Sequence, residues 1–464
     1  MACKRSRNER KEPTMTNTST RREFLTTSSG LAIAGALGAP SMTYAGVGWG
    51  ADKLNLGIIG TGGRGGSNKD QVAGENIQAL CDVNGATLAT TKSYFKDARV
   101  FTDWRELIEE PGLDGVVIST ADHHHAPAAV AAMRRGLHVY CEKPLSHTVA
   151  EARLMQDEYI KRRDKIATQM GTQIHASENY RRVVELVQAG AVGPVKEAHV
   201  WCSRSINAVD TPVLEAQPEP EDFDWDVWLG PAAERPYNQG YWKGGNLNWN
   251  RRWEFGNGVL GDMGSHLIDL AFWALDLRQP LSVESSGPDP DPVGCPPWQD
   301  VVWEHAPRSG NANLEVPTKV FWYHGAEGMR RRSERLQAQL GTDTDLGGWG
   351  IGVAFVGEKG ILVADYGRHL LSPSANFKDY EVPERSIPKS RGHHAEWLHA
   401  CKTGEPTTCN FDYSGALIEH NLLGNVAHRA GKKLEWDAAK MEAKGAPEVS
   451  ELLTKTYREG WDPF

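Results

Sequence analysis

A glycine-rich turn directly after a short apolar run constrains this chain more than any other feature. Residues 54–59 read Leu-Asn-Leu-Gly-Ile-Ile, which predicts a buried parallel strand. The turn that follows has glycines for a tight bend, for close approach of backbone to a pyrophosphate, and for packing of a helix on the strand. Backbone N–H groups at that helix N-terminus would bind phosphate. We expect contacts with a dinucleotide from Gly60, Gly62, Gly63, Arg64 and Gly65.

An acidic residue ends the next apolar run. Residues 77–81 predict a second strand, and Asp82 follows it directly. A carboxylate at this position accepts hydrogen bonds from ribose hydroxyls in dinucleotide-binding folds. The same carboxylate repels a 2′-phosphate, so Asp82 favours NAD over NADP. NADP remains a second possible cofactor because Arg64 and Asn84 follow the two strands and could contact its 2′-phosphate.

Length and composition limit the number of domains and the classes of ligand that the chain can bind. A chain of 464 residues predicts two domains after an N-terminal segment. The net charge of −9 gives no basic footprint for nucleic acid. Seven cysteines without zinc-type spacing predict ordinary thiols and no metal site. Sixteen tryptophans, many of them between positions 225 and 273, indicate either a packed core or a carbohydrate-facing surface.

The N-terminal segment has the layout of an export signal. An Arg-Arg pair at 21–22 precedes Glu-Phe-Leu, a mildly apolar run at 31–38 and a series of small residues. This order is typical of a twin-arginine (Tat) signal, and the apolar run is too short to span a bilayer. We expect residues 1–45 to be removed and the protein to reach the periplasm or the exterior through the Tat machinery. Translation starts at Met1 or at Met15.

That export route bears on the cofactor. The Tat pathway carries folded proteins, whereas NAD is found in the cytoplasm. We therefore expect the nucleotide to be bound before export and then retained.

Strand and helix patterns alternate over residues 53–172, which predicts a Rossmann domain with a parallel, doubly wound sheet. Ligands bind such sheets at the carboxyl ends of the strands. One apolar run ends at Thr120-Ala-Asp-His-His-His125, and the next ends at Glu142-Lys143-Pro144. Three consecutive histidines cannot all face one ion, so they do not predict a metal site. We expect Thr120, His125, Glu142 and Lys143 beside the cofactor.

Residues 173–464 predict an α+β domain with an open, largely antiparallel sheet. Within it, Asp262 to Leu275 predicts an amphipathic helix with Asp262 as the N-cap. Asp262 and His266 are four residues apart and share one helical face. Histidine is suited to accept a proton near neutral pH, and a nearby carboxylate can orient it or raise its pKa. The residues alone leave open a capping aspartate beside a structural histidine.

The Glu142-Lys143-Pro144 segment, downstream of Gly60-x-Gly62-x-x-Gly65, resembles the Gfo/Idh/MocA oxidoreductases, and the resemblance covers the mature chain. It implies that Lys143 lies beside the nicotinamide and the reacting hydroxyl. It also implies that Asp262 and His266 contact substrate hydroxyls, with His266 as the acid/base. The family's open sheet implies a homo-oligomer.

These features predict an NAD-dependent oxidoreductase that transfers hydride between a tightly bound nicotinamide and a sugar, cyclitol or glycoside hydroxyl. One alternative is an NAD-recycling glycoside hydrolase or lyase that oxidises the sugar transiently, with Tyr180 or Tyr241 as an acid. A second alternative is a non-catalytic sugar-binding protein that retains NAD. The sequence does not name the sugar or the carbon oxidised.

Overall fold

The computed structural model describes residues 53–206, 212–340 and 344–464. The predicted export signal, residues 1–45, therefore lies outside the described residues. Within the described ranges, every helix is too short or too polar to cross a membrane.

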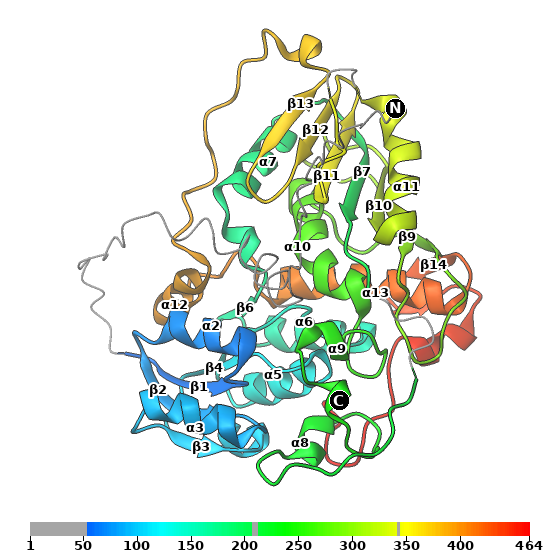
Figure 1. Ribbon diagram of the computed structural model, residues 1–464. Helices are drawn as coiled ribbons and strands as arrows, with labels where there is room; N and C mark the ends of the chain where they lie inside the picture. The colour runs from blue at the N-terminus through cyan, green and yellow to red at the C-terminus, as the bar shows by residue number, and fades with distance from the viewer. Residues whose placement is uncertain (1–52, 207–211, 341–343) are drawn as a thin grey trace, which may run out of the picture. The chain divides into compact units, whose positions relative to one another are not determined.

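The first domain is built on a six-stranded sheet of order β3-β2-β1-β4-β5-β6 (Figure 1). Its neighbouring strands all pair in parallel. The strands are β1 (Asn55–Ile59), β2 (Asn76–Cys81), β3 (Arg99–Phe101), β4 (Gly115–Ile118), β5 (His138–Cys141) and β6 (Thr168–Met170). The order changes direction between β1 and β4, which is the switch point where ligands bind such sheets. The predicted doubly wound Rossmann architecture is confirmed.

Helices connect these strands. They are α2 (Gly63–Val72), α3 (Gly85–Tyr94), α4 (Trp104–Ile108), α5 (His125–Arg134) and α6 (Val149–Ile160), with a 3-10 turn, η1 (Asp122–His124), before α5. Local sequence explains several starts. Asn84 accepts a hydrogen bond from the Thr87 N–H at the start of α3, and Thr148 with Glu151 forms a capping box at the start of α6.

The second domain contains a nine-stranded sheet of order β13-β12-β11-β7-β10-β9-β8-β14-β15. Only β7 and β10 pair in parallel among the described strands of this sheet, so the predicted largely antiparallel sheet is confirmed. Its strands are β7 (Val195–Cys202), β8 (Ser282–Ser286), β9 (Gln299–His305), β10 (Thr318–His324), β11 (Ile351–Gly357), β12 (Ile361–Ala364), β13 (His369–Ser372), β14 (Leu434–Asp437) and β15 (Glu442–Ala443).

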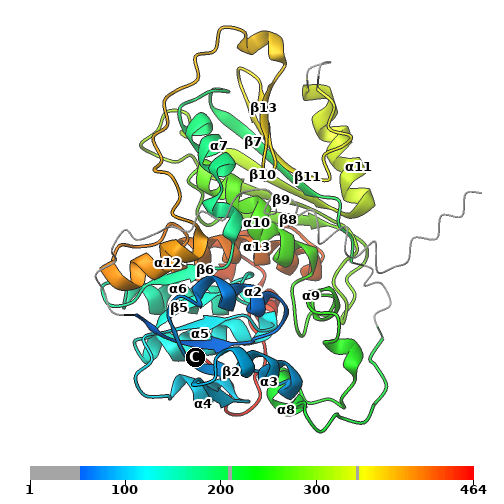
Figure 2. The same cartoon turned by 60° about the vertical axis from the view of Figure 1, so that its left-hand side comes forward.

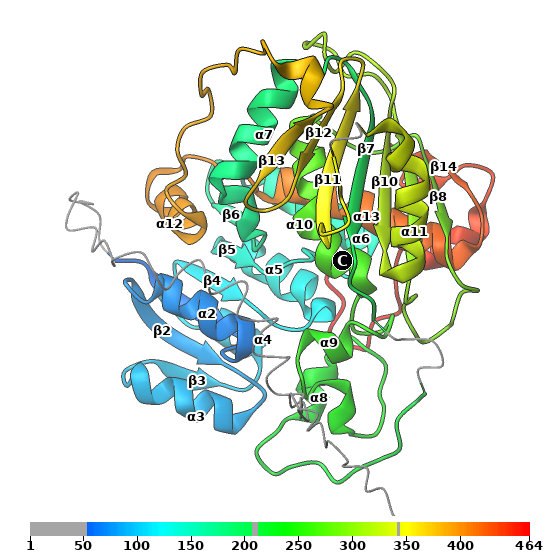
Figure 3. The ribbon, with the colours of Figure 1, turned by 45° about the horizontal axis from the view of Figure 1, so that its top comes forward.

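Helices lie on both faces of this sheet (Figures 2 and 3). Helix α11 packs on β7, β9 and β10 from one side, while α7 and α10 lie on the other. The α-helices after residue 172 are α7 (Glu178–Gln188), α8 (Trp225–Leu229), α9 (Asn246–Trp249), α10 (Gly258–Ala274), α11 (Gly325–Leu336), α12 (His393–Thr403) and α13 (Phe411–Ala430). Of these, α12 packs on the first domain, beside α2. The 3-10 turns are η2 (Gln173–Ala176), η3 (Gln239–Tyr241), η4 (Gln337–Gln339), η5 (Ser374–Phe377) and η6 (Pro447–Leu452).

The predicted start of α10 was wrong. The helix begins at Gly258, with Asn257 in the N-cap position, one turn before Asp262. Gly258 has a φ of +65°, which favours glycine and turns the chain into the helix early. Val259 and Leu260 are buried, so their packing extends the helix at its N-terminus. Asp262 therefore lies inside the helix, and its side chain is available for other partners.

Gly65 tests whether the glycine turn is as tightly packed as the motif requires. A Cβ atom at this position would lie 1.9 Å from the Gly60 carbonyl oxygen. We expect Gly65→Ala to displace the turn and lower NADH affinity about tenfold or more, since such overpacking costs about 1–3 kcal/mol. Gly74→Ala is the control, because a Cβ there meets no atom within 4 Å. Fluorescence titration with NADH measures both, and equal affinities would contradict the expectation.

Candidate functional site

After the glycine turn, no described side chain caps the N-terminus of α2. Gly62 occupies the N-cap position of α2 and supplies no side-chain cap. Gly60 and Gly63 have φ angles of +79° and +51°, so backbone alone shapes the turn. A helix N-terminus without a side-chain cap presents N–H groups and a positive dipole to an anion. This geometry fits a pyrophosphate.

Asp82 lies against the same turn. Its Oδ2 accepts hydrogen bonds from the Thr61 N–H at 2.8 Å and from Thr61 Oγ1 at 3.0 Å. Its Oδ1 accepts from the Asn84 N–H at 3.0 Å. A carboxylate has about four acceptor positions, so capacity remains for a ribose hydroxyl. The turn and Asp82 together fit an NAD molecule.

Arg64 and Glu142 contact each other across the edge of the sheet. Arg64 Nε lies 3.0 Å from Glu142 Oε1, and Asn68 Nδ2 donates to the same oxygen at 2.9 Å. Glu142 is buried while the Arg64 side chain is 42% exposed. The pair holds α2 to the loop after β5. The exposed guanidinium leaves Arg64 accessible to a ligand at this edge.

Of two other predicted residues, Thr120 lies in the loop that follows β4, and His125 is the first residue of α5. His125 is buried, with Nδ1 2.7 Å from the Pro144 carbonyl oxygen and Nε2 3.2 Å from the Thr120 carbonyl oxygen. The imidazole therefore joins the loop after β4 to the loop after β5. His123 and His124 both direct Nε2 at the carbonyl oxygen of Trp228. Within the described residues, no cluster of three or more potential metal ligands occurs.

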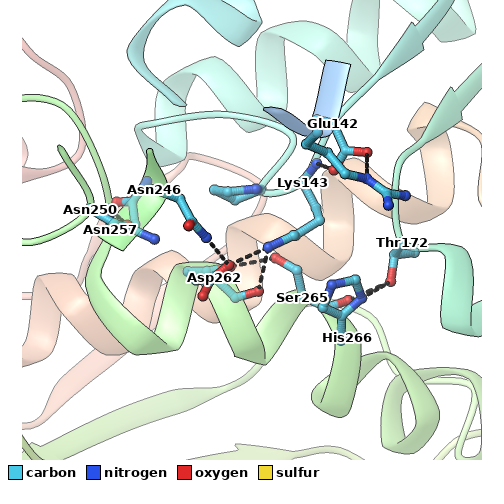
Figure 4. A network of polar contacts seen from close by, with 12 residues as sticks. Glu142, Lys143, Thr172, Asn246, Asn250, Asn257, Asp262, Ser265 and His266 are labelled. Carbon is cyan, nitrogen blue, oxygen red and sulfur yellow. Dashed lines mark hydrogen bonds and ion pairs between the residues drawn. The ribbon is translucent and has the colours of Figure 1, made fainter. Parts of the chain in front are cut away.

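Lys143 crosses from the first domain to Asp262 of the second (Figure 4). Its Nζ forms an ion pair with Asp262 Oδ1 and lies 3.3 Å from the Asp262 carbonyl oxygen. Arg204 Nη1 lies 2.6 Å from Asp262 Oδ2, and Asn246 Nδ2 lies 3.3 Å from Oδ1. Burial opposes ionisation of Asp262, but Lys143 and Arg204 prevail and lower its pKa to about 2.

The sequence did not single out Arg204 or Asn246. Arg204 follows β7, and Asn246 belongs to the short helix α9 within a long excursion before α10. Neither residue lies in a recognisable motif. Only the register of β7 beside α10 and the path of the excursion bring them to Asp262, so no local sequence signal identifies them.

His266 lies one turn further along α10 and is buried (Figure 4). Its Nδ1 lies 3.2 Å from Thr172 Oγ1, and that hydroxyl donates to the Ser265 carbonyl oxygen at 2.9 Å. A hydroxyl has one proton, so Thr172 accepts from a protonated Nδ1, and Nε2 carries the lone pair. Burial, followed by the charge of Lys143, lowers the pKa of His266 to about 3. Thr172, rather than Asp262, hydrogen-bonds the imidazole.

Asp82 provides a direct test of cofactor choice. We expect Asp82→Ser to lower NADH affinity about 10- to 100-fold, because hydrogen bonds to a charged group contribute about 1.5–3 kcal/mol. NADPH affinity should rise relative to NADH, because the repulsion of a 2′-phosphate is removed. Asp114→Ser is the matched control, since its carboxylate accepts from the Asn55 N–H at 2.7 Å at the amino end of β1. An unchanged ratio of the two affinities in fluorescence titrations would argue against this role.

Family models match both domains. Residues 54–170 match the model described as "Oxidoreductase family, NAD-binding Rossmann fold". Residues 184–310 match "Oxidoreductase family, C-terminal alpha/beta domain". Together the matches cover more than half of the 464 residues.

Curated relatives match part of the chain. An inositol 2-dehydrogenase from Salmonella paratyphi B is 29% identical over 165 residues, which are 34% of this chain and 48% of that protein. A levoglucosan dehydrogenase from Pseudarthrobacter phenanthrenivorans is 25% identical over 236 residues, which are 47% of this chain and 50% of that protein. The chain thus spans about half the length of these curated relatives.

Solved structures share the fold over more of the chain. GenD2 from gentamicin A biosynthesis, in complex with NAD, has a TM-score of 0.55 at 17% identity, covering 84% of this chain and 97% of that one. A levoglucosan dehydrogenase in complex with NADH and levoglucosan has a TM-score of 0.53 at 17% identity, covering 82% of this chain and 99% of that one. At this identity the likeness shows the fold. With its first domain and residues 184–310 of its second matched by the family models, the chain belongs to the Gfo/Idh/MocA oxidoreductase family, whose first domain binds NAD.

Proposed function

We propose that this protein is an NAD-dependent dehydrogenase that oxidises a hydroxyl-bearing carbon of a sugar or cyclitol. The observation that carries the proposal is the placement of Lys143, Asp262 and His266 at the edge of the sheet that also holds the glycine turn. The relatives support the substrate class, because they are named inositol and levoglucosan dehydrogenases.

His266 is the proton acceptor in this proposal. When bound, NAD supplies a hydride acceptor at C4 of its nicotinamide ring. The substrate hydroxyl must lose a proton as its carbon loses hydride. His266 is neutral near pH 7 because its pKa is lowered to about 3, and its Nε2 carries the lone pair. A low pKa also makes the imidazole a weak base, so a nearby cation has to stabilise the substrate oxygen.

Lys143 provides that cation. Its ammonium is fixed by Asp262, so positive charge is present before negative charge develops on the substrate oxygen. Asp262 is held in turn by Arg204 and Asn246, and it can accept hydrogen bonds from substrate hydroxyls. The protein therefore supplies orientation and electrostatics in this proposal.

The two alternatives receive no specific support from the described residues. The Tyr180 hydroxyl donates to the His266 carbonyl oxygen at 3.0 Å, and Tyr241 is buried with its hydroxyl 2.9 Å from the Leu214 N–H. Among the described residues, neither hydroxyl contacts the side chain of Lys143, Asp262 or His266, so no contact supports a general-acid role for either tyrosine. A non-catalytic protein would not need Lys143 and His266 beside each other at the predicted cofactor edge.

We also propose export through the Tat pathway with NAD retained. The Arg-Arg pair at 21–22 and the following apolar run support this proposal. Mass spectrometry of the nucleotide released on denaturing the exported protein tests retention. An exported protein without nucleotide would count against it, and an uncleaved N-terminus in the cytoplasm would count against export.

Lys143→Met tests the central claim. Removing the ammonium should lower kcat/KM about 10²- to 10³-fold on whichever substrate a screen of myo-inositol, levoglucosan and related sugars identifies. Lys402→Met is the matched control, because Lys402 also forms a part-buried ion pair, 2.7 Å from Glu75. The measurement is NADH formation at 340 nm. Full activity in Lys143→Met would remove this mechanism.

Thr172→Val tests the tautomer of His266. Valine cannot accept from Nδ1, so the imidazole loses the contact that leaves Nε2 unprotonated. We expect kcat to fall about tenfold, which corresponds to one hydrogen bond of about 1.4 kcal/mol, with NADH affinity unchanged. Thr407→Val is the control, since its buried hydroxyl donates to the Thr168 carbonyl oxygen at 2.7 Å. If both variants lose the same activity, Thr172 has only a packing role.

A further inference from the structure

Asp122 is a buried carboxyl that the proposed mechanism does not use. It begins the turn η1 after β4 and is 4% exposed. Its Oδ2 makes no hydrogen bond of good geometry with another described residue, although the Trp249 indole lies close enough to act on the carboxyl. Buried polar oxygens are nearly always paired, so an unpaired one at the edge of a candidate active site requires an explanation.

The backbone places Asp122 near Lys143. Strands β4 and β5 pair with Ile118 opposite Cys141, so the segments that follow them leave the sheet at the same edge. His125 holds these segments together through its 2.7 Å contact with the Pro144 carbonyl oxygen. Lys143 is also among the charges that act on the Asp122 carboxyl. Lys143 therefore has one buried carboxyl in ion-pair contact, Asp262, and a second, Asp122, whose charge acts on it from beyond that contact distance.

Several elements contribute groups around Asp122. Its titratable and polar neighbours are Lys143, Asp262, Trp249, Cys141, Cys295 and Lys455. Burial is the largest influence and raises the pKa of Asp122 to about 8 against the opposing charge of Lys143. Asp262, which is paired with Lys143 and Arg204, has a pKa lowered to about 2. When their environments separate the pKa values of two carboxyls in this way, the two groups have different roles.

We propose that Asp122 is a positioning residue for Lys143. While its carboxyl is uncharged, the ammonium pairs with Asp262. Once Asp122 ionises, it competes with Asp262 for the ammonium and draws it from its position. The catalytic consequence rests on the proposed function, whereas the sharing of one lysine by two carboxyls is independent of any substrate.

The first test needs no substrate and compares thermal unfolding of the wild type and Asp122→Asn between pH 5 and pH 9. The unfolded carboxyl titrates near pH 4 and the folded one near pH 8. The wild type therefore binds a proton in the folded state that it releases on unfolding, and its stability falls as pH rises. Relative to Asp122→Asn, its folding constant should fall roughly tenfold per pH unit until about pH 8.

The melting temperature of Asp122→Asn should accordingly exceed that of the wild type at pH 7 to 8, and the difference should shrink toward pH 5. A difference that does not change with pH would overturn the proposal. The proposal would also be overturned if Asp122→Asn melted at a lower temperature than the wild type and this difference in melting temperature grew as the pH rose. That result would mean that Asp122 is already ionised and ion-paired in the native protein.

The second test asks whether the two carboxyls share Lys143. In an Asp262→Asn background the ammonium loses its first partner, so Asp122 should ionise at lower pH. The change in melting temperature caused by Asp122→Asn should then depend little on pH. Asp300→Asn serves as the matched background, because this buried aspartate is held by Arg331 and Arg335. Equal pH dependence in the Asp262→Asn and Asp300→Asn backgrounds would overturn the sharing.

Activity gives a separate readout. If the sugar screen yields turnover, kcat of the wild type should decline above about pH 8, and Asp122→Asn should lack that decline. A decline that persists in the variant would overturn the positioning role. A complete absence of turnover would count against the proposed function, while the two unfolding tests would still decide the charge sharing.

Discussion

The ion pair between Lys143 and Asp262 is the contact on which the rest of the site depends. Lys143 comes from the Rossmann domain and Asp262 from α10 of the second domain, so the pair fixes one domain against the other. Both charged groups are largely withdrawn from water, and each needs its partner. Removing one member of a buried pair typically costs about 3–5 kcal/mol. A site built across two domains is thereby held in one arrangement before a ligand binds.

Helix α13 reinforces this arrangement. It packs against α6 of the first domain and α10 of the second, and it is buried over most of its length. The Arg153 guanidinium on α6 donates to both carboxylate oxygens of Glu419 on α13, with contacts of 2.7 Å and 2.9 Å. Bidentate pairs of this kind fix orientation as well as distance. The two domains therefore share a packed helical layer in addition to the ion pair at the site.

The fold of the first domain could be predicted from the sequence because the patterns that indicate it are local. The glycines of the turn, the apolar strands and the polar residues at their ends are all read from contiguous residues, and the fold and family they predicted are confirmed. Roles that depend on tertiary packing were harder to predict. The start of α10 was set by burial of Val259 and Leu260, which overrode the capping preference of Asp262. Arg204, Asn246 and Thr172 reach the site through register and loop path, which no local pattern encodes. The predicted roles of the site residues stay predictions.

Helix α11 determines which surface the outer face of the nine-stranded sheet presents to another molecule. It covers β7, β9 and β10, and its Arg331 and Arg335 pair with Asp300 of the sheet. The outward side of the helix carries Glu327, Arg330 and Glu334, which form ion pairs with one another. A surface of paired charges is screened by salt and has little apolar area to bury. Any self-association over this helix would therefore be polar and weakened by rising ionic strength, unlike the dry apolar contact that an uncovered sheet would make.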